Sequence, residues 1–399
     1  MESVLKKRTT LVKQADRFGT QFPVRLLGES LSFLGTGELV GSQSVCSGWK
    51  LSPSLLNRAW ERLYAQNWEA RSGERKEIAV DGVATPWLQR YKRRKQTEDN
   101  WRYGLFRRVR TRYTGHTRCT TRVGENLLAI GAAVEGTITL LDVHTNSVVK
   151  AVDSAIAPFS LAHHDNLLLS GVGHGEIKSW LLPDLIFQRD YQGLNNPVTL
   201  LATNGKLLVG GDHINLIIWA AATGESHSVL SLQGRPTGLD VDWTTGTAYV
   251  CLVLGNNEKI IQAISLGTGH VLRQVSIDQY GAGYRSVLFR PDHGDLLIAS
   301  NYVGGLIRQV SIPELRLQEY KVDKWHWSTL EVRSSAARAA HVGWHAGQKQ
   351  ITLQSPKTLL DIGSWALPKR PRQLAATVTK LFLFEVPSGL TVLDFSPCF

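Results

Sequence analysis

One pattern recurs from Tyr113 to the end of the chain, and it constrains the fold more than any other feature. Each unit reads as a short β-like run, a turn, a second run, a Gly-rich turn, a third run that often ends in Trp, and a fourth run. Three units align on their middle hairpins, ENLLAIGAAVEGTITLLDVHTNS, DNLLLSGVGHGEIKSWLLPD and GKLLVGGDHINLIIWAAATGE. Seven units of about 41 residues fill this part of the chain, within the period of roughly 40–45 residues that marks four-stranded propeller blades. The repeat therefore predicts an all-β, seven-bladed β-propeller.

The units resemble WD repeats at several signature positions. The Asp that this family carries in the middle hairpin is replaced by Glu135 and His174 in the first two units. We therefore expect a weaker His-to-Asp hydrogen-bond network, with the blades held more by packing of alternating Leu, Val and Ile. The positions that match the Gly-His, Trp-Asp and tryptophan signatures are Gly115, His116, Leu141, Asp142, Trp180 and Trp219.

The last unit, residues 369–399, has room for three strands only, in RQLAATVT, KLFLFEV and GLTVLDF. A propeller needs its last blade completed, because an open edge leaves backbone groups unpaired. The segment LFRRVRTRY, residues 105–113, alternates so that Leu105, Val109, Thr111 and Tyr113 share one face and Arg108, Arg110 and Arg112 the other. This alternation predicts that 105–113 is the missing outer strand. Arginines on the solvent face of such a strand also guard against edge-to-edge association.

Before the repeats, residues 22–63 contain three short stretches with apolar side chains at helical spacing. They resemble the F-box, whose Leu-Pro, Leu-pair, Phe-Leu, Val-Cys-x-x-Trp and Leu-x-x-x-Trp pattern is matched with few departures. The matching residues are Pro23, Leu26, Leu27, Phe33, Leu34, Leu39, Val45, Cys46, Trp49, Leu56 and Trp60. Spacing alone also fits an ordinary three-helix cap packed on the rest of the protein.

The segment between these two parts, residues 86–104, is similar to the connector of F-box proteins that carry WD repeats. The residues that carry this similarity are Trp87, Tyr91, Arg94, Asn100, Trp101 and Gly104. The expected organisation is therefore a mobile tail over 1–20, an all-α three-helix F-box module over 21–68, a linker and connector helix over 69–104, and a propeller over 105–399.

The net charge of +11 is concentrated in one region of the chain. Residues 90–122 hold twelve Lys or Arg against Glu98 and Asp99, which is +10 of the total. A nearly neutral main domain lacks the broad positive face of a dedicated DNA-binding protein. The run Lys92–Lys95 also fits a nuclear import signal.

No catalytic, cofactor or metal constellation stands out in the sequence. Phosphate-loop, zinc-protease and serine-hydrolase motifs are absent, and the four cysteines are scattered without metal-ligand spacing. No apolar run approaches the roughly 20 residues of a membrane span, and the start lacks the pattern of a secretory signal. These features predict a non-catalytic protein of a reducing compartment, the cytoplasm or the nucleus.

The resemblance implies a substrate-recognition subunit of an SCF-type ubiquitin ligase. The module would bind the Skp-type adaptor, and through it a cullin and a RING protein, while the propeller binds the target. The expected adaptor-binding residues are Pro23, Leu26, Leu27, Leu31, Leu34, Leu39, Val45, Cys46, Trp49 and Trp60. Two alternatives stay open: a WD-repeat scaffold without a ligase role, and a nucleic-acid-associated factor that uses residues 90–122.

In related receptors, arginines on the top face clamp phosphorylated target segments. The sequence offers Arg118, Arg122, Arg235 and Arg285 as candidates for target binding. The middle-hairpin positions that often carry a second arginine are small or neutral here, which argues against a strong phosphate clamp. Those positions are Ala133, Val172 and Gly211.

Overall fold

The computed structural model describes most of the chain that follows the predicted module. The described ranges are 60–62, 87–103, 105–111, 113, 115–124, 126–278, 284–290, 295–300, 307–312, 314–318, 341–345, 350–354, 361–366, 373–376, 380–384 and 390–396. Residues 1–98 belong to one compact unit and 99–398 to a second. Because residues 1–59 lie outside the described ranges, the predicted tail and most of the predicted F-box module do too.

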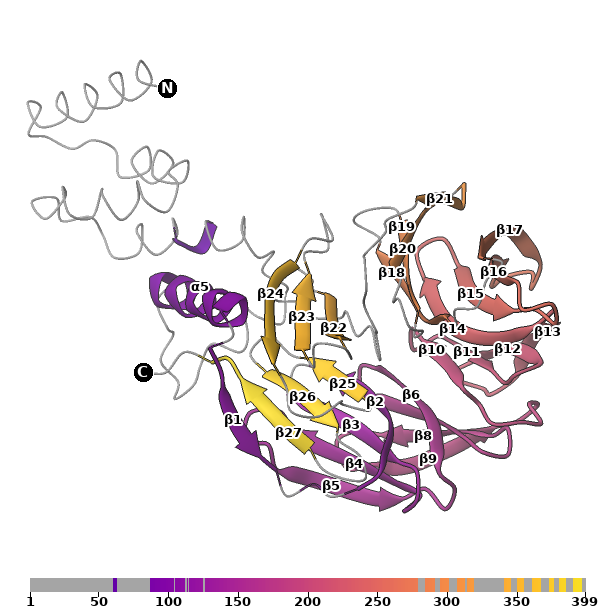
Figure 1. The fold of residues 1–399 in the computed structure, drawn as a ribbon. Helices are drawn as coiled ribbons and strands as arrows, with labels where there is room; N and C mark the ends of the chain where they lie inside the picture. The colour runs from indigo at the N-terminus through magenta and orange to yellow at the C-terminus, as the bar shows by residue number, and fades with distance from the viewer. Residues whose placement is uncertain are drawn as a thin grey trace, which may run out of the picture. The chain divides into compact units, whose positions relative to one another are not determined.

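The second unit consists of antiparallel sheets, each formed mainly by strands consecutive in the sequence (Figure 1). The first three sheets are β2 (Thr117–Val123), β3 (Leu127–Ala132), β4 (Thr137–Asp142) and β5 (Val148–Asp153); β6 (Pro158–His164), β7 (Leu167–Val172), β8 (Ile177–Leu181) and β9 (Ile186–Tyr191); and β10 (Leu200–Thr203), β11 (Leu207–Gly211), β12 (Asn215–Ala220) and β13 (Ser226–Ser231).

The remaining sheets follow the same order, with one exception at the end of the chain. They are β14 (Arg235–Asp242), β15 (Thr247–Val253), β16 (Lys259–Ser265) and β17 (Val271–Asp278); β18 (Tyr284–Arg290), β19 (Asp295–Ser300), β20 (Ile307–Ser311) and β21 (Arg316–Gln318); β22 (His341–His345), β23 (Gln350–Gln354) and β24 (Asp361–Ala366); and β25 (Gln373–Ala376), β26 (Lys380–Phe384) and β27 (Leu390–Asp394) with β1 (Arg107–Arg110). The described residues thus form six sheets of four strands and one of three.

The first strands of neighbouring sheets contact one another, and we call them the inner strands. The contacting pairs are β25 with β2, β2 with β6, β6 with β10, β10 with β14, and β14 with β18. Apolar side chains of adjacent sheets form the core between them, because β-strands present alternate residues to opposite faces. One such cluster joins the third and fourth sheets through Val209, Leu216, Val250 and Ile260, all nearly inaccessible to solvent. The core is therefore divided into layers between successive sheets.

The strand expected over 105–113 is present as β1, which completes the last sheet. It pairs antiparallel with β27, from Arg107 opposite Asp394 to Arg110 opposite Thr391. Val109 packs against an apolar cluster that the last sheet shares with the first. Leu105 differs from the expectation, because it precedes the strand and is 56% exposed. Pairing of the early chain with its end thus leaves β27 covered on both sides.

Side chains at two of the WD-signature positions, His116 and Trp180, form hydrogen bonds in the structure. The imidazole Nδ1 of His116 lies 3.2 Å from a carboxylate oxygen of Glu135, so the glutamate replaces the family's aspartate in the first sheet. In the second sheet, where His174 occupies that position, the indole N–H of Trp180 donates to Ser170 Oγ at 2.9 Å. The glutamate thus preserves a His-to-carboxylate hydrogen bond in the first sheet.

Helix α5, Trp87–Tyr103, covers the segment predicted to be a connector. In the first unit, Trp60 lies with its ring centroid 5.2 Å from that of Tyr91. In the second unit, the Trp101 indole stacks on Phe395, with centroids 3.8 Å apart and planes 13° apart. Asn100 Nδ2 donates to the Phe395 carbonyl at 2.9 Å. The last turn of α5 is thus anchored to the residue that follows β27. None of the described helices has the length and apolarity needed to cross a membrane.

Candidate functional site

Among the predicted adaptor-binding residues, only Trp60 lies within the described ranges. Its side chain is 1% exposed and faces Tyr91. Trp60 therefore packs within its own unit. The nine others, which lie outside the described residues, are Pro23, Leu26, Leu27, Leu31, Leu34, Leu39, Val45, Cys46 and Trp49.

Two of the four predicted target-binding arginines occupy equivalent positions in their sheets. In β2 the pairing register shifts between Thr117 and Cys119, which leaves Arg118 in a bulge near the start of the strand. In β18 the register shifts between Tyr284 and Ser286, and Arg285 lies in the corresponding bulge. A bulge re-aims the extra residue and is common beside binding sites.

The other two candidate arginines lie at different ends of their strands. Arg235 is the first residue of β14, so it belongs to the same end of the inner strands as the two bulges. Arg122 stands near the end of β2, opposite Leu128. It lies four positions after Arg118, which is about 13 Å along a strand. The structure therefore groups Arg118, Arg235 and Arg285 at one end and leaves Arg122 at the other.

The Arg118 side chain contacts an aromatic ring of the neighbouring sheet. Its guanidinium carbon lies 3.1 Å from the ring centroid of Phe159, the residue that occupies the matching bulge in β6. A guanidinium over an aromatic face is held by the ring quadrupole, typically by about 0.5–1 kcal/mol at exposed sites. Arg118 therefore serves first as a link between the first two sheets.

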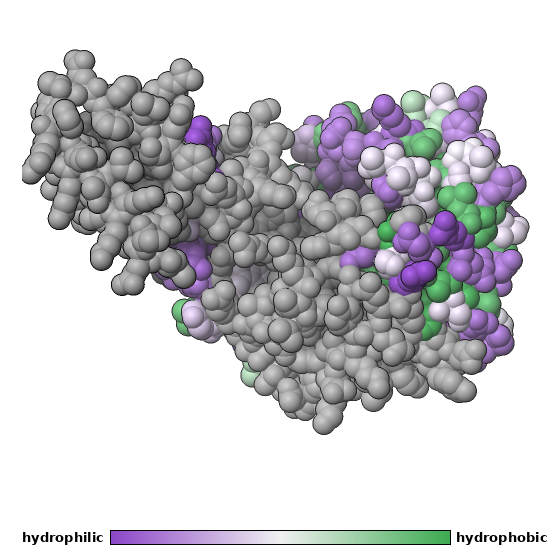
Figure 2. Space-filling view, turned by 90° about the horizontal axis from the view of Figure 1, so that it is seen from above, coloured by the Kyte–Doolittle hydropathy of each residue, from purple (hydrophilic) through white to green (hydrophobic). Residues whose placement is uncertain are grey.

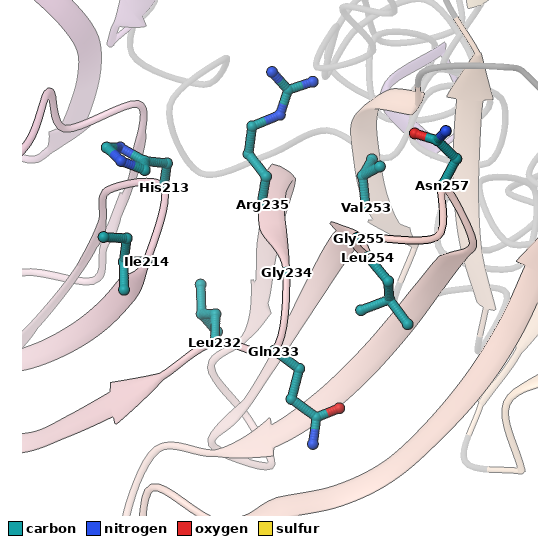
Figure 3. A pocket seen from close by; sticks show the side chains of 10 residues that line it. All are labelled: His213, Ile214, Leu232, Gln233, Gly234, Arg235, Val253, Leu254, Gly255 and Asn257. Atoms are coloured by element: carbon teal, nitrogen blue, oxygen red, sulfur yellow. The ribbon is translucent and has the colours of Figure 1, made fainter.

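Arg235 lines an open pocket of about 610 Å³ between the third and fourth sheets (Figure 3). Three short segments form its walls: the turn between β11 and β12, the link between β13 and β14, and the turn between β15 and β16. In Figure 3 the side chains of His213 and Arg235 extend from separate walls. The lining residues are His213, Ile214, Leu232, Gln233, Gly234, Arg235, Val253, Leu254, Gly255 and Asn257.

The wall that carries His213 is fixed by the buried carboxylate of Asp212. Its Oδ1 accepts the N–H groups of Ile214 and Asn215, each at 2.7 Å, and its Oδ2 accepts Asn196 Nδ2 at 3.1 Å. Burial by itself would raise the pKa of Asp212, but these hydrogen bonds to the charged form lower the pKa below its ordinary value. The turn therefore has one defined conformation around an ionised side chain.

The other two walls are held by main-chain hydrogen bonds and by close packing. Leu232 N donates to the Ile214 carbonyl at 2.7 Å, and Leu254 N donates to the Glu258 carbonyl at 2.8 Å. A Cβ on Gly234 would lie 2.5 Å from the Val253 carbonyl oxygen, so only glycine lets these two walls approach so closely. The three segments thus form a rigid recess.

The described residues that line the pocket combine apolar side chains with one guanidinium, that of Arg235, and include no carboxylate. Leu232 and Leu254 are half-buried at the edge of the core between the two sheets. Within the described part of the chain, no carboxylate lies within ion-pair distance of Arg235. The space-filling view shows apolar residues interleaved with hydrophilic ones on the side where β10–β17 lie (Figure 2). The site can therefore receive a ligand that is partly apolar and partly anionic.

The sequence predicts Arg235 but none of the other lining residues. They come from three turns that share no motif, and only the sheet register brings them together. The one available signal is the position of Gly234, immediately before the predicted arginine and inside a segment that links two strands. Among the described residues, no group of three or more His, Cys, Asp or Glu side chains gathers as a metal site would require.

No family model and no curated protein matches this chain. Solved structures do match its fold. Kuenenia stuttgartiensis hydrazine synthase aligns with a TM-score of 0.60 at 9% identity, covering 72% of this chain and 97% of that one. The β-propeller domain of Cps50 (Swd1) from Myceliophteria thermophila aligns at 0.59 with 13% identity, covering 72% and 99%. The computationally designed Ika8 protein aligns at 0.51 with 16% identity, covering 72% and 98%. The repeated sheets of this chain therefore have the β-propeller fold, and we call each sheet a blade.

Proposed function

We propose that this chain is the substrate-recognition subunit of an SCF-type ubiquitin ligase. In this proposal the segment 21–68 docks on a Skp-type adaptor, which links the chain to a cullin and a RING protein. The propeller binds a target protein at the end where Arg235 lines the pocket. The chain makes and breaks no bond itself. It acts in the cytoplasm or the nucleus by raising the effective concentration of a target lysine near the conjugating enzyme.

The connector carries this proposal. Its aromatic and polar signature residues are all buried in the structure: Trp87, Tyr91, Arg94, Asn100 and Trp101. Eight of the seventeen residues of α5 are charged, six of them Lys or Arg and two of them acidic. The burial of these five side chains is therefore selective rather than general. Trp101 and Asn100 both contact Phe395 after the last strand. A linker that merely tethered two domains would be rich in Gly, Ser and Pro and would lack such anchors.

The test is co-purification of the adaptor with the full chain. Leu27→Ala with Leu31→Ala should remove the adaptor, because two apolar anchors are lost from the predicted docking face. Val271→Ala with Leu272→Ala is the matched control, since both side chains are exposed on β17 of the propeller. Thermal unfolding of each variant checks that the propeller remains folded. Undiminished adaptor binding by the Leu27/Leu31 variant would contradict the proposal.

The two alternatives make different predictions. A scaffold without a ligase role captures no adaptor or cullin even as the wild-type chain. A nucleic-acid-associated factor loses binding steeply as salt rises, because each phosphate contact releases counterions. Two arginines of the basic region already have protein partners: Arg107 pairs with Asp394 at 3.2 Å, and Arg118 lies over Phe159. These contacts favour a structural role for that part of the region.

A further inference from the structure

We propose that the pocket between the third and fourth blades binds an extended, unphosphorylated acidic segment of the target protein. One apolar side chain of this segment packs on Leu232 and Leu254, and one carboxylate pairs with Arg235. The inference rests on the proposed function for the identity of the ligand as a target protein. The chemistry of the pocket specifies which kind of segment it accepts.

The apolar contact follows from the position of the two leucines. Leu232 and Leu254 pack on the core between the blades and remain partly exposed at the pocket. Ile214, on the opposite wall, is 47% exposed. Burying a Leu-sized side chain here would remove apolar surface from water on both partners, which favours binding. A wholly polar segment would leave these apolar surfaces in contact with water, so they would contribute no binding free energy.

The charge of the pocket selects a carboxylate over a phosphate. Arg235 supplies one guanidinium, whose paired N–H donors match a carboxylate in a bidentate geometry. A phosphate group carries a charge of about −1.5 to −2 and is typically held by a cluster of arginines. The middle-hairpin position of the third blade, beside the pocket, is Gly211, and the described residues that line the pocket include no second Lys or Arg. One exposed arginine therefore fits a single negative charge.

The remaining polar groups suit the main chain of a peptide. The side-chain amides of Gln233 and Asn257 line the pocket, and among the described residues neither has a hydrogen-bond partner for its carboxamide. Each carboxamide offers both a donor and an acceptor, as the amide groups of an extended peptide require. The pocket is open to solvent rather than enclosed, so an extended chain can enter it.

Hydrogen bonds and close packing within the chain hold the recess in shape, which lowers the entropic cost of binding. Asp212 holds the His213 wall through four hydrogen bonds, from Asn195 N, Asn196 Nδ2, Ile214 N and Asn215 N. Close contact at Gly234 holds the other two walls together.

The test is fluorescence anisotropy of the full chain with a labelled Gly/Ser peptide that carries a central Leu-Glu-Leu. Matched peptides replace the Glu by Gln or by phosphoserine, or both Leu by Ser. Wild type should bind the Leu-Glu-Leu peptide best, and Arg235→Gln should weaken it about tenfold or more, as expected for a charge-assisted pair. Arg273→Gln is the control, because that arginine is exposed on the outer strand of the same blade.

A second variant blocks the pocket without touching the core. The ideal Cβ position of Gly255 has no atom within 4 Å, so Gly255→Leu adds bulk at the lining at little cost to folding. This variant should also weaken peptide binding about tenfold. Equal binding by wild type and Arg235→Gln, stronger binding of the phosphoserine peptide, or no binding of the Leu-Glu-Leu peptide would each overturn the inference. Adaptor capture is measured separately, so failure of the ligase proposal would not be mistaken for failure of this one.

Discussion

The side-chain ammonium of Lys380 donates a hydrogen bond to the main-chain carbonyl of His144, across the junction between the last and the first blade, with Nζ and O 2.7 Å apart. Nζ also donates to Asn146 Oδ1 at 3.1 Å. Burial lowers the pKa of Lys380, and the nearby Asp394 carboxylate acts in the opposite direction. A buried cation thus joins segments more than two hundred residues apart, at the place where β1 completes the propeller.

Lys380→Met should lower the free energy of unfolding by about 3 kcal/mol, because it leaves two acceptors without their charged donor. Methionine keeps most of the volume of the side chain, so little of this effect comes from a cavity. Lys150→Met, at an exposed position on β5, should change stability by less than about 0.5 kcal/mol. Urea unfolding of both variants and of the wild type measures these differences in the free energy of unfolding. Equal stabilities would show that the junction does not depend on this cation.

Trp101→Ala should destabilise the propeller by about 3 kcal/mol, since a buried indole stacked on Phe395 is lost. Tyr103→Ala is the matched control on the same helical turn, because Tyr103 is 66% exposed. We expect the midpoint of denaturant unfolding to fall for the first variant and to stay unchanged for the second. A similar small effect of both would mean that the last turn of α5 is not a structural anchor.

Part of this fold follows from the sequence alone. The period of the repeats predicts the blades, because each unit must bury the faces of its strands against the next unit. Alternation in 105–113 predicts β1 and its apolar Val109. The exposure of Leu105 was not predicted, because alternation alone does not show that pairing begins only at Arg107.

The candidate site is harder to predict from the sequence than the fold is, for a physical reason. Arg235 could be selected as a charged residue at the start of a strand, but Leu232, Leu254 and His213 carry no signal of their own. Their proximity depends on how two blades and three turns pack, which no local pattern encodes. In the same way, the sequence shows Glu135 as a departure from the family, and only the structure shows that it still bonds His116.

Asp212→Asn should lower the free energy of unfolding at neutral pH by about 2 kcal/mol, because the amide cannot accept all four N–H groups. The pKa of Asp212 is lowered in the folded protein, so its stabilisation is complete above the unfolded pKa of about 3.9 and is lost as pH falls through the folded value. The difference between wild type and variant should therefore shrink below about pH 4. Urea unfolding at pH 7, 5 and 3 measures it. A difference that stays constant would argue against an ionised Asp212.

Gly171→Ala should destabilise the second blade by about 2 kcal/mol through overpacking. The new Cβ would lie 2.5 Å from Ser160 Oγ and 2.7 Å from the Val198 side chain, where the second and third blades meet. Gly173→Ala is the control in the same hairpin, since its Cβ would lie 3.4 Å from Phe159, an ordinary contact. Thermal unfolding of the two variants should separate them clearly. Equal melting temperatures would mean that the blades can move apart at this point.

The ligase proposal is tested most directly by quantitative mass spectrometry of proteins captured from cells with the full chain while ligase turnover is blocked. Leu27→Ala with Leu31→Ala should lose the adaptor and cullin but keep the target proteins. Arg235→Gln should keep the adaptor and cullin but lose target proteins. Capture of the same proteins by both variants, or the absence of adaptor and cullin from the wild-type sample, would contradict the proposal.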